Sequence, residues 1–121
     1  MSPRPSGGMK SAVLKSPALR NSAPVFAALG DETRLRLVAV LCAGGAFSIA
    51  QLTSGTQITR QAVTKHLRVL AAAGLVRDVK AGRQRLWGFE SQSLDDARCS
   101  LEMIAGQWDQ ALMQLKRAVE G

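Results

Sequence analysis

The sequence contains few of the residues that build metal sites, disulfide frameworks or catalytic relays. Only two cysteines, Cys42 and Cys99, and one histidine, His66, occur among its 121 residues. Two cysteines cannot form a disulfide framework or a four-cysteine metal site, and one histidine argues against a histidine-rich site. No nucleophile stands beside a base and an orienting group, so we expect neither an enzyme nor a cofactor.

Long apolar runs and aromatic residues are also scarce. No apolar run approaches the roughly 20 residues that a membrane span requires, so we expect no membrane partner. Tyrosine is absent and aromatics make up 4% of the chain, so the core must consist mainly of Leu, Val, Ile and Ala. Because 46% of the residues are hydrophobic, a wholly disordered chain is excluded. The length fits one compact domain with a tail.

Positive charge is concentrated in one stretch of a chain whose formal net charge is +7. Residues 59–89 contain seven Lys or Arg and one Asp, which gives +6. A concentrated positive field of this kind is typical of a domain that docks on phosphates. The charge distribution by itself fits equally well a basic surface that contacts only solvent.

The N-terminal residues 1–17 are rich in Ser, Pro and Gly and show no hydrophobic periodicity. We therefore expect a disordered basic tail there and a folded domain over residues 18–121. The tail has no apolar segment long enough for a signal peptide. Whether it contacts DNA stays open.

Helical periodicity dominates the chain as far as Gly74. The helices are expected to begin at four capping residues, which are Ser22, Asp31, Ser48 and Thr59. The predicted buried faces are Leu35, Val38, Leu41 and Cys42 on the second helix, and Val63, Leu67 and Leu70 on the fourth. Cys42 is thus expected to fill the core, and His66, beside Leu67, to be buried or half-buried.

After Gly74 the spacing of hydrophobic residues changes from the helical period to one typical of strands. The segments 75–80 and 85–89 flank a glycine-containing link of hairpin length, which predicts a β-hairpin. Before it, the short helix at 48–54 and the helix at about 59–73 form a helix-turn-helix. The predicted fold is therefore mainly α: a winged helix-turn-helix of four helices, two strands and one last helix.

The outward side of the fourth helix carries side chains suited to reading or gripping DNA. Gln61, Ala62, Thr64 and Lys65 are placed for base edges, and Arg60 and Arg68 for phosphates. Thr59, as the helix cap, leaves backbone N–H groups free for a phosphate. The hairpin adds a basic tip beside the DNA backbone or in the minor groove, made of Lys80, Arg83, Gln84 and Arg85.

A heptad seam runs along the last helix, which Ser93 is expected to cap. Its members are Leu94, Ala97, Leu101, Ile104, Trp108, Ala111, Leu115 and Ala118. The rest of a chain of this size offers too little surface to bury so long an apolar stripe, so we expect a homodimer. The alternative is that the stripe packs wholly on its own domain.

Two segments resemble a known family. Residues 27–37, AALGDETRLRL, resemble the opening ALGDPTRLRIL signature of ArsR-type winged-helix repressors. Residues 61–76, QAVTKHLRVLAAAGLV, resemble their recognition helix, commonly SxHLxxLxxAGLV, and residues 77–89 are similar to their wing. The resemblance covers about residues 22–119. It implies a dimeric bacterial repressor, cytoplasmic and nucleoid-associated, whose first and last helices form the dimer, which adds Phe26 to the interface.

The resemblance does not extend to the metal sensors of this family. Many members carry a Cys-x-Cys pair in the third helix, where this chain reads FSIAQL over residues 47–52. Others use His, Asp and Glu ligands on the last helix, which here contains no histidine. A tight transition-metal site needs three or four such ligands. The chain therefore resembles the metal-independent branch, as its ending over residues 107–116 also does.

The function expected from these features is sequence-specific binding of double-stranded DNA by a repressor. It would act as a homodimer on an inverted repeat, with an effector that the sequence does not identify. One alternative is a redox-responsive regulator that uses Cys42 and Cys99, which requires Cα atoms within about 7 Å. Another is a winged helix that binds protein instead of DNA.

Overall fold

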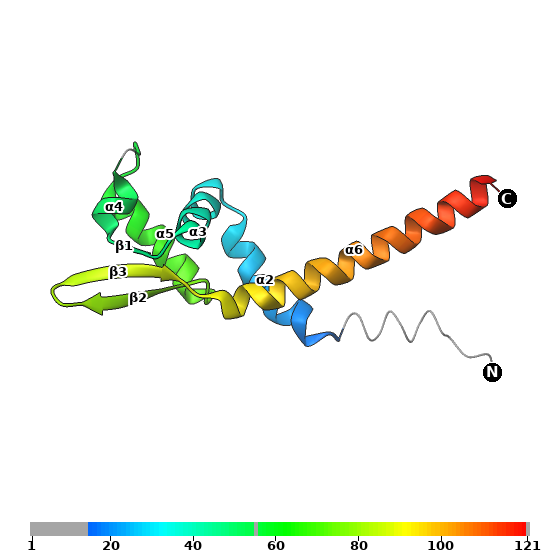
Figure 1. The fold of residues 1–121 in the computed structure, drawn as a ribbon, viewed down its shortest axis with the longest axis horizontal. Coiled ribbons are helices and arrows are strands. Elements are labelled where there is room, and N and C mark those ends of the chain that lie inside the picture. Colours follow the sequence, from blue (N-terminus) through cyan, green and yellow to red (C-terminus); the bar gives the residue numbers. More distant parts are fainter. Residues whose placement is uncertain (1–14, 55, 121) are drawn as a thin grey trace.

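The computed structural model describes residues 15–54 and 56–120, so most of the predicted tail lies outside the described residues. The elements are α2 (Pro17–Leu29), α3 (Glu32–Ala43), β1 (Ala46–Phe47), α4 (Ile49–Thr53), α5 (Arg60–Ala72), β2 (Val76–Ala81), β3 (Gln84–Phe89) and α6 (Ser91–Glu120). Three antiparallel strands form one sheet in the order β1-β3-β2 (Figure 1). The winged helix-turn-helix architecture is as predicted, with one strand more than expected.

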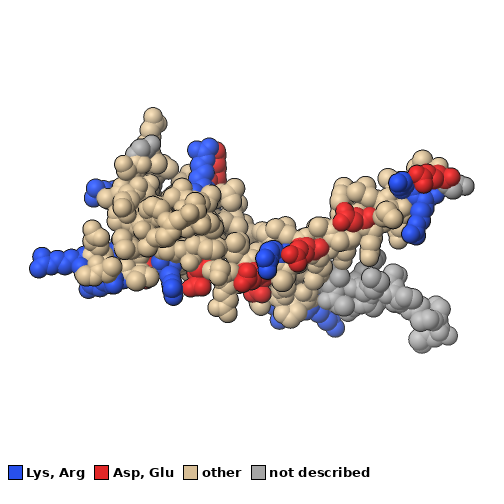
Figure 2. Space-filling model, in the orientation of Figure 1, with Lys and Arg blue, Asp and Glu red and all other residues tan. Residues whose placement is uncertain are grey.

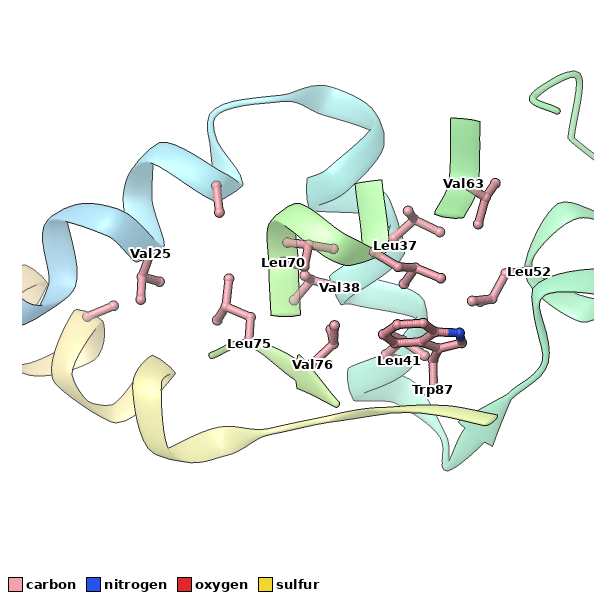
Figure 3. Close-up of a cluster of buried hydrophobic side chains, with 13 residues drawn as sticks. Val25, Leu37, Val38, Leu41, Leu52, Val63, Leu70, Leu75, Val76 and Trp87 are labelled. Carbon is pink, nitrogen blue, oxygen red and sulfur yellow. The ribbon is translucent and has the colours of Figure 1, made fainter. Parts of the chain in front are cut away.

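The core is aliphatic and is centred on the inner face of α5. Val63 is 1% exposed, and Leu67 and Leu70 are fully buried, which confirms the predicted orientation of this helix. They pack with side chains from α2, α3, α4 and the sheet (Figure 3). Trp87 of β3 is also buried and anchors the hairpin to the helices.

Three of the five predicted helix caps are confirmed by hydrogen bonds. The Asp31 carboxylate accepts from the backbone N–H of Arg34 at 3.0 Å, and the Thr59 hydroxyl accepts from that of Ala62 at 3.1 Å. Ser48 forms a reciprocal capping box with Gln51. These bonds satisfy N–H groups that lack partners within the helix.

The predicted caps at Ser22 and Ser93 are wrong, because both residues lie inside helices. Helix α2 begins at Pro17, since proline suits a first helical position, where no N–H bond is lost. Ser22 is buried and its hydroxyl lies 2.7 Å from that of Ser100, which joins α2 to α6. Ser93 lies beneath Gly74, which has a φ of 78° and no room for a Cβ against the Ser93 hydroxyl.

The predicted buried face of α3 is partly wrong. Val38 and Leu41 are buried as expected, but Leu35 is 52% exposed and Cys42 is exposed, while Leu37 is buried instead. Apolar residues occupy more than one side of this helix, so the pattern fits two rotations and neighbouring elements decide between them. Strand β1, which pairs with Gly88 and Trp87, was not expected, because two residues give no periodic signal.

Helix α6 packs on the domain only near its start. Ala97 and Ser100 are its buried residues, and they face α2. From Leu101 onward nearly every residue is exposed, and the helix extends away from the body of the molecule (Figure 1). None of the described helices is both long and apolar enough to cross a membrane.

Candidate nucleic-acid interface

The outer face of α5 presents the predicted polar side chains together. An open groove of about 510 Å³ is lined by Arg60, Gln61, Thr64, Lys65 and Arg68. Burial of the opposite face holds these side chains outward, because a helix cannot rotate without exposing its inner residues. Helices α4 and α5 form a helix-turn-helix, and α5 presents a face of the kind that enters a major groove.

The start of α5 offers backbone donors as well as side chains. The first N–H groups of a helix have no intrahelical acceptor, and no acidic residue occupies the first turn of α5 to neutralise them. Thr59 is exposed and Ala62 half-buried at this end. The Thr64 hydroxyl donates to the Arg60 carbonyl at 2.8 Å, so it offers a base its acceptor oxygen and methyl group.

The hairpin places its basic residues near a tight tip. Ala81 pairs with Gln84, so only Gly82 and Arg83 form the connection, and Gly82 adopts a φ of 63°. Lys80 pairs with Arg85, and directly opposed residues point to the same side of an antiparallel pair. All four predicted wing residues, Lys80, Arg83, Gln84 and Arg85, are exposed.

One wing residue has an acidic partner that sequence reasoning missed. The Asp78 carboxylate lies 3.1 Å from Nε of Arg85, two positions along the strand from Lys80. Alternation within a strand places Asp78 and Lys80 on one side, which is the signal that could have revealed this pair. The Arg85 guanidinium is therefore already paired with a carboxylate of its own hairpin.

The charges divide the molecule into a basic end and a mixed end. Lys and Arg side chains surround the hairpin tip, whereas acidic side chains are spaced along α6 (Figure 2). The concentration of charge seen in residues 59–89 thus coincides with α5 and the wing. A polyanion approaching this end meets the positive field first.

His66 lies behind the candidate interface and not within it. Its side chain is 24% exposed, and Nδ1 lies 3.8 Å from the Asp31 carboxylate, so the expected half-buried state is confirmed. The hydrogen bond from the backbone N–H of Arg34 holds the pKa of Asp31 below its usual range, and the positive charge of the Arg34 guanidinium adds to this effect. The pair links α5 to the start of α3.

The cysteines do not form a site in the described structure. Both are free and exposed, so the expectation that Cys42 fills the core is wrong: it lies at the edge of the buried face of α3. Partial burial raises the pKa of the Cys42 thiol, which lowers its reactive thiolate fraction. Among residues 15–54 and 56–120, no three His, Cys, Asp or Glu side chains form a metal-binding group.

The predicted dimer residues divide into two groups. Ala97 is buried, and Phe26 and Leu94 are half-buried against the core of their own chain. The remaining members of the set are all exposed, namely Leu101, Ile104, Trp108, Ala111 and Leu115. The chain therefore covers the start of the seam itself and leaves the rest open.

Comparison with known proteins identifies the family. A helix-turn-helix domain model matches residues 29–79. The HTH-type transcriptional regulator YuzN of Bacillus subtilis is 36% identical over 80 residues, which cover 61% of this chain and 87% of that protein. The arsenical resistance operon repressor of the same species is 34% identical over 99 residues, covering 78% and 94%.

Solved structures agree with these relatives. An ArsR-like transcriptional regulator from Rhodococcus sp. RHA1 superposes with a TM-score of 0.69 at 36% identity, covering 84% of this chain and 95% of that one. These relatives are transcriptional regulators, and the superposition covers most of both chains, so the winged helix-turn-helix architecture is shared. The chain belongs to the ArsR-type winged helix-turn-helix transcriptional regulators.

Proposed function

We propose that the protein is a repressor that binds an inverted repeat in double-stranded DNA as a homodimer. The observation that carries this proposal is the polar, cationic groove on α5 beside a basic wing. A protein-binding winged helix would need no such concentration of charge. Repression would follow from occupation of a promoter, in line with the repressor of arsenical resistance among the relatives.

The homodimer is inferred from the uncovered part of α6. This helix has 30 residues, so it is about 45 Å long, and its outer half contacts little of its own chain. Leu101 is 54% exposed, Ile104 51% and Trp108 66%. A second copy carries the same stripe, and a two-fold axis would bring the two stripes together.

Pairing of this kind dictates the form of the DNA site. A two-fold axis relates the two α5 helices, so they read two copies of one half-site in opposite orientations. Helices in successive major grooves on one face of the duplex are about 34 Å apart. The proposed operator is therefore an inverted repeat whose half-sites lie about one helical turn apart.

Base readout by α5 is tested by substitution of Gln61 and Lys65. In Gln61→Ala or Lys65→Ala, discrimination between the operator and a mutated operator should fall by about 1–3 kcal/mol, because a donor or acceptor to a base edge is lost. Fluorescence anisotropy with both duplexes measures this. Arg98→Ala on α6 removes an exposed charge away from α5 and should leave discrimination unchanged. Unchanged discrimination in both α5 variants would contradict the assignment.

The wing should contribute unequally through Arg83 and Arg85. Arg83→Ala should weaken binding to all sequences and lower the slope of log K against log salt by about one, since one phosphate contact is lost. Arg85→Ala should cost less, because Asp78 already engages that guanidinium. Conversely, Asp78→Asn should strengthen binding. Fluorescence anisotropy at several salt concentrations measures the DNA affinity of the three variants. Equal changes of affinity in all three would refute the expected order.

The dimer is tested by a charge placed in the exposed seam. Ile104→Glu should shift the protein towards monomer, because the exposed side chain is proposed to be buried between two copies. Sedimentation equilibrium measures the shift, and Gln110→Glu on the opposite side of the helix is the control. A wild-type protein that sediments as a monomer at micromolar concentration would disprove the proposed dimer.

A further inference from the structure

A second hollow lies behind the recognition helix and belongs to none of the DNA-facing surfaces. It has a volume of about 420 Å³ and lies between α3 and the segment that joins α4 to α5. Leu37, Leu52 and Val63 form its buried apolar floor, and Val40 and Ile58 continue it towards the opening. Pockets of this size with an apolar lining and a few polar groups are typical binding sites for small molecules.

Charged groups at the opening indicate which chemistry fits. Arg36 donates from Nη2 to the Glu32 carboxylate at 2.6 Å, and both side chains are largely exposed. A guanidinium has five N–H donors, so Arg36 can hold a second carboxylate while it keeps Glu32. The net charge of +7 also favours an anion over a cation.

The pocket shares its wall with the turn that positions α5. The Thr56 hydroxyl donates to the Thr53 carbonyl at 2.7 Å and accepts from the N–H of Ile58 at 3.4 Å. Thr56 and Ile58 both line the pocket, and α5 begins two residues after Ile58. A molecule in the pocket therefore touches the segment that sets where α5 starts.

We propose that this pocket binds a small amphipathic monocarboxylate that weakens DNA binding. Its apolar body would lie on Val40 and Ile58 over the buried floor, with its carboxylate on Arg36. By wedging between α3 and the turn, it would displace the start of α5 from the position that DNA requires. The consequence for DNA rests on the proposed function, but occupancy of the pocket does not.

Octanoate is a suitable probe, because it joins an unbranched alkyl chain to one carboxylate. In a ¹H–¹⁵N NMR titration of the full chain without DNA, octanoate should cause saturable shifts at the amides of residues 36–40 and 56–58. Val40→Phe fills the pocket from an exposed position and should abolish these shifts. Leu35→Phe makes the same kind of change on α3 outside the pocket and should preserve them.

The carboxylate contact and the DNA coupling need separate measurements. Arg36→Gln should weaken octanoate binding about fivefold or more, whereas Arg98→Gln, an equally exposed arginine on α6, should not. Saturating octanoate should raise the Kd for duplex DNA at least about fivefold in the wild type and leave it unchanged in Val40→Phe.

The outcomes separate the two proposals. Absence of saturable shifts, or equal shifts in Val40→Phe, would overturn the pocket whatever the DNA experiment shows. Octanoate binding in the pocket with an unchanged DNA affinity would overturn its regulatory role. Failure of the octanoate-free protein to bind any duplex would instead refute the proposed function, and the NMR result would still decide whether the pocket is a carboxylate site.

Discussion

Burial of one face of α5 is the constraint on which the rest of the structure depends. Val63, Leu67 and Leu70 are fully or almost fully buried, and any rotation of the helix would expose them to water. Full burial of each such side chain stabilises the fold by about 1.5–3 kcal/mol. Burial of the inner face therefore fixes the opposite face outward. The arginine, lysine and glutamine side chains of that face stay exposed.

The same packing connects α5 to the rest of the domain. Asp31 caps the start of α3 and lies beside His66 in the middle of α5, so one side chain contacts both helices. Trp87 holds the wing in the same core, which sets the hairpin beside α5. In the proposed complex with DNA, affinity would come from the charge at the exposed end, and specificity from the few side chains of α5 that reach base edges.

Local signals predicted the parts of the fold that local physics decides. The caps at Asp31, Ser48 and Thr59 and the period of α5 depend on neighbours within four residues, and all were predictable. The rotation of α3, the burial of Ser22 against Ser100 and the short β1 depend on distant segments, so they were not. In the candidate site, the placement of the α5 side chains followed from their spacing, whereas the pairing of Asp78 with Arg85 needed the register of the hairpin in addition to the alternation along β2.

The central claim is that DNA contacts the outward face of α5 and the tip of the wing. The most direct test is a ¹H–¹⁵N NMR titration of the protein with duplex DNA at low salt. The account predicts that the largest shifts and line broadening occur at residues 59–68 and 80–85, with little change specific to residues 109–120. Perturbation centred on α6, or none at α5, would contradict it.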